Sequence, residues 1–202
     1  MKTNIKISGI LSAALLLFCL FAFKPLEEKK VVVIDAGHGG DDLGAAMYGF
    51  QEKTISEAIA KKIKAFNKDS NLDIVLIRDS DSSMDLHKRV SLINSLKPDL
   101  VISLHVNASK EAQANGVDAY ISSKNEFYEK SKESAERIVN GISGDNLLRR
   151  RVNEAPFYIL KNSNCAAITL LMGFLSNNKD REYLTSEAGQ NEIAANILEA
   201  IK

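Results

Sequence analysis

The chain contains few of the residues that mark several protein classes. Its 202 residues include no tryptophan, three prolines, three histidines and two cysteines. Because Cys19 lies in an N-terminal apolar run, only Cys165 belongs to the folded part, and no internal disulfide can form there. The hydrophobic core must then stabilise the fold by itself. We expect Cys165 to be a small buried hydrophobic residue rather than a metal ligand.

An excess of charge of one sign is also absent. The sequence has 26 lysines and arginines and 26 aspartates and glutamates, so its formal net charge is +0. This balance argues against a nucleic-acid partner. The exception is the basic triplet Arg149-Arg150-Arg151, and such a triplet is usually a solvated loop or an ion-paired turn. A hydrophobic fraction of 45% and a charged fraction of 26% indicate one compact globular domain, which we expect to be a monomer.

The longest apolar run lies near the N-terminus. Ile10–Phe23 follows the basic residues Lys2 and Lys6 and has the length of a signal peptide. The run is shorter than the ~20 residues that span a bilayer, which favours cleavage. No small-x-small triplet marks a cleavage site, so an uncleaved anchor remains the alternative. We assign residues 1–24 to a signal peptide or N-terminal membrane anchor, residues 25–30 to a linker and residues 31–202 to an exported domain.

Beyond the linker, predicted strands and helices alternate, which is typical of α/β proteins. The predicted strands are residues 31–35, 73–78, 99–106, 117–122, 157–160 and 166–172. The first, third and last are apolar without alternation, as expected for central strands covered on both faces. Four helices are predicted by apolar faces at Ile55, Ile59, Ile63 and Phe66, at Leu86, Val90 and Ile93, at Ala135, Ile138 and Ile142, and at Ile193, Ile197 and Ile201. The expected fold is α/β, a single domain with a mostly parallel central sheet of about six strands flanked by helices.

Two of the three histidines occupy equivalent positions at the ends of predicted strands. His38 follows the first strand in a glycine-rich turn, His105 lies in the third strand, and Glu52 begins a helix between them. Ligands of open α/β sheets gather outside the carboxyl ends of the strands. Two imidazoles and one carboxylate can hold zinc and leave a fourth position for water. By spacing alone, a zinc site and ordinary structural histidines both remain open, and His87, inside a predicted helix, is expected on the surface.

Local motifs add a family resemblance to these observations. They are Val33–Gly40, Asp42–Ala45, Glu52–Lys53, Arg78, Asp79–Asp81, Leu86 with Arg89 and Asn94, Asp99–Ala108, Gly116–Val117 and Gly173–Asn177. With these motifs in order from Val31 to about Ile201, the chain resembles the zinc-dependent N-acetylmuramoyl-L-alanine amidases of the Amidase_3 type, which cut peptidoglycan. The resemblance implies Zn²⁺ as cofactor, with His38, Glu52 and His105 as its ligands. These are the three residues that the strand ends had indicated.

The resemblance also implies a reaction and a place for it. The family hydrolyses the amide between the lactyl group of N-acetylmuramic acid and the L-alanine of the stem peptide. Peptidoglycan is therefore the expected partner, and the periplasm or cell wall is the expected location. Asn107 matches a position that can contact substrate, although an asparagine just after a strand is also a common turn former.

Other residues in the matching motifs have structural interpretations. Arg89 lies on the second predicted helix, where we expect an ion pair with Asp79 or Asp81. Asp35 and Asp42 are candidates to accept the second ring N–H of a liganding histidine, a contact that fixes the histidine tautomer.

One position departs from the family pattern. The family places a catalytic glutamate two residues before the Gly-Phe-Leu-Ser-Asn turn, and this chain has Leu171 there, with no acidic residue between Glu154 and Asp180. Such a glutamate passes a proton from the attacking water to the leaving amine. The catalytic residue is therefore unknown. Glu154, Asp42 and Asp118 are candidates to replace it, each with an alternative interpretation as a surface or capping residue.

Three functions remain open at this point. The first, which we favour, is an exported zinc amidase that acts through a substitute acid or through metal activation alone. Loss of a general acid–base group typically costs ~10²–10⁴ in rate, so slow hydrolysis is compatible with Leu171. The second is a catalytically impaired relative that binds zinc and peptidoglycan. The third is a zinc hydrolase with altered specificity, such as a peptidase of stem peptides.

Overall fold

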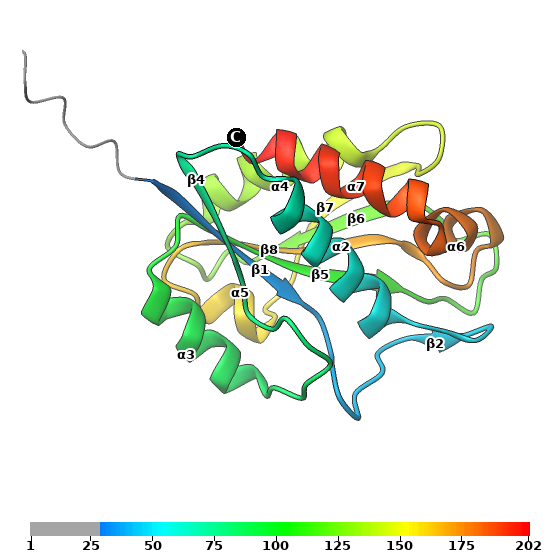
Figure 1. The fold of residues 1–202 in the computed structure, drawn as a ribbon, viewed down its shortest axis with the longest axis horizontal. Coiled ribbons are helices and arrows are strands. Elements are labelled where there is room, and N and C mark those ends of the chain that lie inside the picture. Colours follow the sequence, from blue (N-terminus) through cyan, green and yellow to red (C-terminus); the bar gives the residue numbers. More distant parts are fainter. Residues whose placement is uncertain (1–28) are drawn as a thin grey trace, which may run out of the picture.

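The structure, a computed structural model, describes residues 29–202 (Figure 1). Its centre is a six-stranded sheet with the strand order β4-β1-β5-β8-β6-β7. The expected signal peptide or anchor, residues 1–24, and most of the linker lie outside the described residues. Within residues 29–202, no helix is both long enough and apolar enough to cross a membrane.

The elements alternate along the chain as the sequence predicts. The sheet contains β1 (Lys30–Ala36), β4 (Leu72–Leu76), β5 (Leu100–Asn107), β6 (Val117–Ile121), β7 (Arg149–Glu154) and β8 (Ala166–Phe174). A small hairpin is formed by β2 (Ala46–Met47) and β3 (Phe50–Gln51). The helices are α2 (Glu52–Phe66), α3 (Leu86–Leu96), α4 (Tyr128–Ile142), α5 (Tyr158–Asn162), α6 (Asn178–Thr185) and α7 (Glu187–Ala200). The four predicted apolar faces belong to α2, α3, α4 and α7.

Neighbouring strands run parallel, except that β6 is antiparallel to β8. The expected single α/β domain with a mostly parallel six-stranded sheet is therefore confirmed. Because β1, β5 and β8 are parallel, their carboxyl ends meet at one edge of the sheet. His38 follows β1 at this edge, and His105 lies near the end of β5.

The hairpin of β2 and β3 and the helix α6 were not predicted, and two further segments differ from the sequence prediction. The predicted strand at residues 157–160 is wrong, because Phe157 is the N-cap of α5. A short apolar run fits one face of a helical turn as well as it fits a strand, and Ile159 and Leu160 are buried in this form. The sixth strand is β7 instead. It is an edge strand, so its charged sequence gave no apolar signal.

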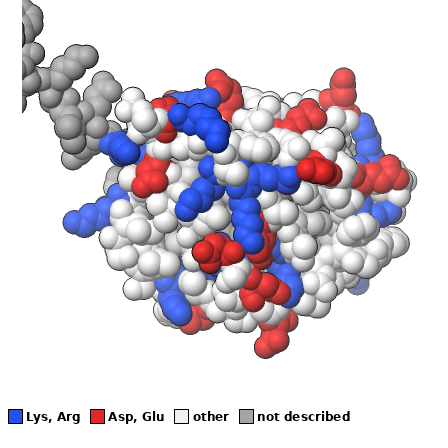
Figure 2. Space-filling view, viewed as in Figure 1, with Lys and Arg blue, Asp and Glu red and all other residues white. Residues whose placement is uncertain are grey.

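The arginine triplet lies in this edge strand rather than in a loop or turn. Arg149 pairs with Glu136 at 2.6 Å and Arg150 pairs with Asp118 at 2.8 Å, so the expected ion pairing is confirmed for these two residues. Figure 2 shows acidic and basic side chains mixed over the face in that view. This mixture agrees with the balanced composition.

One face of the sheet packs against three helices and is called the covered face. Val32, Ile34, Ile102, Ile168 and Leu170 are fully buried on it. Helices α2, α4 and α7 lie over this face and add their apolar residues to the same core (Figure 1). Successive residues of a strand point to opposite faces, so this core uses every second residue of each central strand.

The other face, called the open face, is covered only in part. Over its amino-terminal half, α3 and α5 pack on Val33, Val101 and Ala167. Toward the carboxyl ends, β5 and β8 carry Ser103, His105, Thr169 and Leu171, which line a groove of about 490 Å³. The polar residues of the central strands therefore lie where helices no longer cover the sheet.

Candidate functional site

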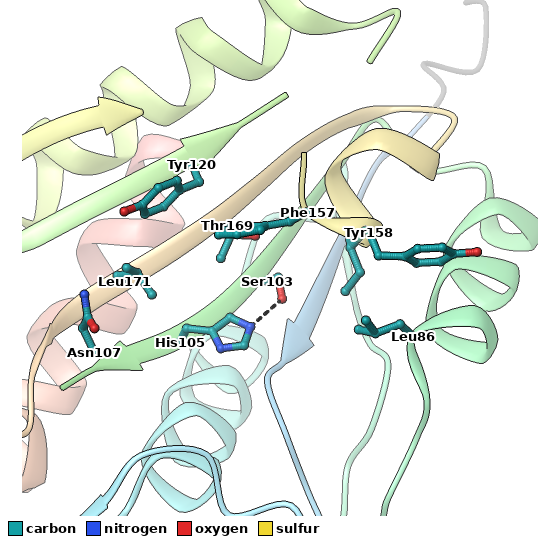
Figure 3. Close-up of a pocket in the computed structure, with 10 residues that line it drawn as sticks. Leu86, Ser103, His105, Asn107, Tyr120, Phe157, Tyr158, Thr169 and Leu171 are labelled. Atoms are coloured by element: carbon teal, nitrogen blue, oxygen red, sulfur yellow. Dashed lines mark hydrogen bonds between the residues drawn. The ribbon is translucent and has the colours of Figure 1, made fainter. Parts of the chain in front are cut away.

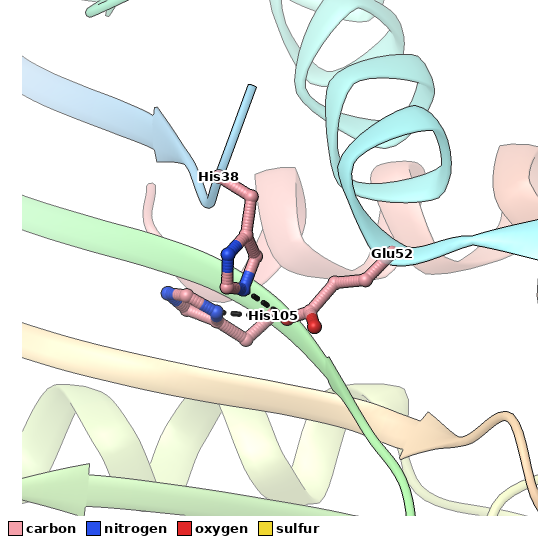
Figure 4. A group of neighbouring side chains, drawn as sticks. All are labelled: His38, Glu52 and His105. Carbon is pink, nitrogen blue, oxygen red and sulfur yellow. Dashed lines mark hydrogen bonds and ion pairs between the residues drawn. The ribbon is translucent and has the colours of Figure 1, made fainter. Parts of the chain in front are cut away.

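Three donor atoms converge at the carboxyl edge of the sheet (Figure 4). Glu52 Oε1 lies 3.1 Å from His38 Nε2 and 2.8 Å from His105 Nδ1. These residues come from the loop after β1, the start of α2 and strand β5, and their donor atoms lie within 4.8 Å of one another. Two nitrogens and one oxygen at this spacing fit a tetrahedral zinc ion, whose bonds to such atoms are about 2.0–2.2 Å long. This donor cluster contains all three residues that the sequence indicated.

Glycines let the backbone pass close to the donor cluster. A Cβ atom at Gly44 would lie 2.4 Å from Glu52 Oε2 and 2.6 Å from His38 Cδ2. At Gly37 it would lie 2.5 Å from His105 Cε1. His38 itself has a φ of 60°, a left-handed conformation that is uncommon for residues other than glycine. The loop is therefore shaped around the cluster, because a larger residue at either glycine would displace a donor side chain.

Glu52 supplies the negative charge of the cluster. It is 5% exposed and accepts hydrogen bonds from the backbone N–H groups of Ala45 at 2.7 Å and Val106 at 2.9 Å. Burial alone raises the pKa of Glu52, but hydrogen bonds from His105 and His38 outweigh it and hold this pKa well below its ordinary value. The hydrogen bond to Glu52 raises the pKa of His38, against the opposing effect of burial. The cluster therefore attracts a cation, either a proton or a metal ion.

A second hydrogen bond holds each histidine ring. His38 Nδ1 lies 2.8 Å from Asp42 Oδ2, which leaves Nε2 directed at the centre of the cluster. His105 Nε2 lies 3.2 Å from Ser103 Oγ, and Ser103 donates its own proton to Asp35 Oδ2 at 2.6 Å. Ser103 is therefore the acceptor for His105 Nε2–H, and Nδ1 faces the centre. Asp42 makes the contact that the sequence predicts, whereas Asp35 reaches His105 only through Ser103.

Arg89 connects the loop of His38 to strand β1. Its guanidinium group is 4% exposed, pairs with Asp35 and donates a hydrogen bond to the carbonyl oxygen of His38 at 2.5 Å. The expected pairing of Arg89 with Asp79 or Asp81 is therefore wrong. Asp35 is 1% exposed, and a buried carboxylate needs a cationic partner more than a surface carboxylate does.

Two supporting residues were not assigned from the sequence. Arg78 is 4% exposed and donates hydrogen bonds to the carbonyl oxygens of Ala36 and Gly37, each at 3.0 Å. Arg78 thus fixes the start of the loop. Ser103 interrupts an apolar central strand two residues before His105. That interruption was the available signal, because a buried hydroxyl needs a hydrogen-bond partner.

A groove on the open face runs beside the donor cluster (Figure 3). It is lined by Leu86, Ser103, His105, Asn107, Tyr120, Phe157, Tyr158, Ile159, Thr169 and Leu171. In the register of β5 and β8, His105 is the direct neighbour of Leu171. Asn107 lies on the same strand as His105 and faces the groove. The lining offers aromatic, aliphatic, hydroxyl and amide groups, but no carboxylate.

The three candidate substitutes for the missing glutamate lie in different settings. Glu154 is exposed and accepts a hydrogen bond from a tyrosine hydroxyl at 2.8 Å. Asp118 is buried and pairs with Arg150 at 2.8 Å. Asp42 alone among the three touches the donor cluster, through Nδ1 of His38.

The remaining histidine and the cysteine take no part in the cluster. His87 is exposed on α3, and its Nδ1 lies 2.8 Å from the hydroxyl of Tyr158, so the expected surface position is confirmed. Cys165 is 2% exposed, and burial raises the pKa of its thiol to about 12. It is the small buried residue that the sequence predicts.

Comparison with known proteins gives relatives along almost the whole domain. The family described as N-acetylmuramoyl-L-alanine amidase (Amidase_3) matches residues 32–202. The chain is 34% identical over 184 residues to the uncharacterized protein YqiI of Bacillus subtilis (strain 168), covering 91% of this chain and 88% of that one. It is 28% identical over 183 residues to the probable cell wall amidase LytH of Staphylococcus saprophyticus, covering 89% of this chain and 59% of that one.

A solved structure has the same fold. The crystal structure of N-acetylmuramoyl-L-alanine amidase from Clostridium difficile 630 matches with a TM-score of 0.80 at 30% identity, covering 86% of this chain and 95% of that one. The family match includes the donor cluster, the groove and both core faces. The chain therefore belongs to the Amidase_3 family, and its enzyme class is N-acetylmuramoyl-L-alanine amidase, a hydrolase of peptidoglycan.

Proposed function

We propose that this chain binds Zn²⁺ through His38 Nε2, Glu52 Oε1 and His105 Nδ1 and cleaves the amide between N-acetylmuramic acid and the L-alanine of the stem peptide. The observation that carries this proposal is the convergence of the three donors at the carboxyl edge of an amidase domain. A bound zinc ion lowers the pKa of its water toward ~7 and polarises the scissile carbonyl group.

The neighbouring side chains prepare the site for this role. Asp42 and Ser103 each hold a histidine ring so that the other ring nitrogen offers its lone pair to the metal. Asn107 contacts the substrate in the groove. Tyr120 and Phe157, whose ring centroids are 5.2 Å apart, form an apolar wall that limits access of water.

Proton transfer is the weak step of the proposed reaction. Hydrolysis requires a group that takes a proton from the attacking water and gives it to the leaving amine. The family glutamate falls on Leu171, the neighbour of His105 in the sheet. Asp42 is already engaged with His38, so we expect solvent water to carry this proton, while a bound zinc ion would supply the activation. Loss of general acid–base catalysis makes the rate of hydrolysis about 10²–10⁴ lower than that of an enzyme with the glutamate.

A second candidate function is favoured by the lining of the groove. The donor cluster and the groove are both present, but none of the residues that line the groove carries a carboxylate. Asp118, the register neighbour of Leu171 on β6, is paired with Arg150. A protein of this kind binds zinc and peptidoglycan without cutting, and serves as a wall-binding or regulatory protein. This function predicts retention on peptidoglycan without release of peptide.

We also propose that the protein acts outside the cytoplasm, in the periplasm or at the cell wall, as a monomer. The apolar N-terminal run supports export, either with cleavage or with the run retained as an anchor. The similarity to a protein described as a probable cell wall amidase supports the same location.

A digest of purified peptidoglycan tests these proposals. The zinc-loaded full chain, in mild detergent, is compared with His38→Ala and Leu171→Glu, and released stem peptides are identified by mass. Release of L-alanine-headed peptides that depends on zinc and on His38 supports the amidase. Release by Leu171→Glu alone supports the binding protein. Release by none of the three, together with no retention on peptidoglycan, would overturn both candidates.

A further inference from the structure

A row of facing residues leads from the donor cluster across the open face of the sheet. In the strand register, His105 of β5 neighbours Leu171 of β8, and Leu171 neighbours Asp118 of β6. On β7, the register shifts so that Arg150 and Arg151 lie together opposite Asp118. Two residues of one strand opposite one residue of its partner form a β-bulge. Two arginines therefore end the row that begins at His105.

The residues on either side of the bulge show which face the two arginines share. Arg149 pairs with Glu136 of α4, a helix that packs on the covered face. Val152 packs against the core of the same face. Regular alternation would place residues 149 and 151 on the same face. Residues 149 and 152 lie toward the covered face, and the ion pair with Asp118 places Arg150 on the open face. The register shift puts Arg151 beside Arg150 in the bulge. Bulges beside active sites commonly redirect a side chain in this way.

The end of the row carries an excess of positive charge. Arg150 Nε donates a hydrogen bond to Asp118 Oδ2 at 2.8 Å, and its guanidinium carbon lies 5.2 Å from the ring centroid of Phe174. The side chain of Arg150 is 40% exposed, so part of its guanidinium group faces solvent. Arg151 is exposed, and its side chain has no ion pair within residues 29–202. The end of the row thus holds two arginines and one carboxylate. Arg150 pairs with Asp118 through its guanidinium group, whereas Arg151 donates to it only through its backbone N–H, at 3.4 Å.

We propose that Arg150 and Arg151 form an anion subsite beside the groove that binds a free carboxylate of the stem peptide. This subsite rests on the proposed peptidoglycan function and names the part of the substrate that it holds. The lactyl carboxyl group of N-acetylmuramic acid is consumed in the scissile amide, so the carboxylates available to the site belong to the peptide. Guanidinium groups bind carboxylates through paired, charge-assisted hydrogen bonds.

The dimensions of the sheet suit this occupant. Neighbouring strands lie ~4.8 Å apart, so β7 is about 14 Å from β5, the length of about four extended residues. A short peptide with its first amide at the donor cluster spans the distance to the arginines. Along this path it crosses Leu171 and the apolar and hydroxyl groups of the groove. The carboxylate of Asp118, which follows Leu171 in the row, is buried and paired with Arg150.

Binding of a muramoyl pentapeptide with free carboxylates, compared with the same compound converted to carboxamides, tests the subsite. Titration calorimetry uses the zinc-loaded full chain in the cold, and mass spectrometry confirms that the ligand stays intact. We expect the free acid to bind about tenfold more tightly than the amide, because charge-assisted hydrogen bonds are stronger than neutral ones. Arg151→Gln should abolish most of this difference.

Two further variants separate the subsite from general charge effects and from misfolding. Arg149→Gln removes the same charge from the other face and should keep the preference for the free acid. The double variant Arg150→Gln with Asp118→Asn removes the ion pair without leaving a buried charge, and should also lose the preference. Equal binding of acid and amide by the unmodified chain, or an equal effect of Arg149→Gln and Arg151→Gln, would overturn the subsite. If neither compound binds and peptidoglycan is not retained, the proposed function fails and the subsite fails with it.

Discussion

Two adjacent strands present opposite chemistry to the site. On β5, His105 is held by hydrogen bonds through Ser103 to Asp35. On β8, at the same level of the register, Leu171 presents an aliphatic side chain to the groove. The chain has the donors and supports that suit a metal ion, but it lacks a carboxylate where protons would be moved. The candidate metal donors come from the loop after β1, from α2 and from β5, whereas the position that the family pattern gives to the proton-transfer group lies on β8.

The substitution Leu171→Glu removes this contrast by placing a carboxylate on β8. It has the largest expected effect, which is on the rate of peptide release. A carboxylate beside His105 can accept the proton of the attacking water and pass it to the leaving amine, so release of stem peptide should accelerate by about 10²–10⁴. The measurement is the initial rate of peptide release at saturating zinc. Leu171→Gln has a similar size without the base and is the control. Equal rates for the two variants would show that position 171 does not limit proton transfer.

The two faces of β8 can be compared by truncating one residue on each. Ile168 is fully buried on the covered face, and Ile168→Ala should lower the free energy of unfolding by about 2–5 kcal/mol. Leu171 is only partly buried beside the groove, so Leu171→Ala should cost about 1 kcal/mol. Urea denaturation followed by circular dichroism measures both. Similar losses for the two variants would contradict the description of one face as open.

The substitution Ser103→Ala tests whether the hydrogen bond between Ser103 and His105 on β5 increases the affinity for zinc. Without the hydroxyl, His105 Nε2–H loses its acceptor, and outer contacts of this kind typically change metal affinity about 10–100-fold. Titration calorimetry with zinc measures the affinity. Thr169→Val is the matched control, because Thr169 is the register neighbour of Ser103 on β8. Unchanged affinity in Ser103→Ala would remove Ser103 from the metal site.

The smallest expected effect is a pH dependence of stabilisation by zinc. The pKa of His38 is raised above its ordinary 6.5 by Glu52. Protonation of His38 therefore stabilises the metal-free fold. This stabilisation is fully present below pH 6.5 and is lost as the pH rises through the pKa that His38 has in the folded protein. Zinc requires the unprotonated ring, so the rise in melting temperature caused by zinc should grow from about pH 5.5 to about pH 8.

The same thermal measurement contains its own control. In His38→Ala, the zinc-induced change should be small at every pH, because one of the three donors is absent. Glu52 contributes no change over this interval, since its pKa is held well below its ordinary value. A zinc effect that decreases as pH rises in the unmodified chain would contradict the assignment of His38 as a ligand.

Much of the sheet could be predicted because its central strands must be apolar on both sides. Continuous apolar runs identified β1, β5 and β8 without ambiguity. The edge strand β7 escaped prediction because it has few apolar positions and contains the arginine triplet. The apolar segment 157–160 was assigned to a strand, since a single helical turn and a short strand share the same pattern.

The site shows a similar division. His38, Glu52 and His105 were identified from their positions at strand and helix ends and from the family motifs. The pairing of Arg89 with Asp35 was missed. These residues are far apart in the chain, and a buried ion pair between α3 and the end of β1 leaves no local sequence pattern. The relay through Ser103 was missed although Ser103 interrupts the apolar run of β5, because the sequence does not show which groups a buried hydroxyl contacts.

The sequence by itself determined the α/β class, the central strands, the three donor residues and the absence of a glutamate at position 171. The class and the central strands depend on residue identity and periodicity along the chain, whereas the three donors and position 171 depend also on the resemblance to the family motifs. The tertiary structure decided that one sheet face stays open, that Leu171 neighbours His105, and that a bulge brings Arg150 and Arg151 into the same row. These features depend on strand order and register, which join residues far apart in the chain through backbone hydrogen bonds and through the burial of the covered face.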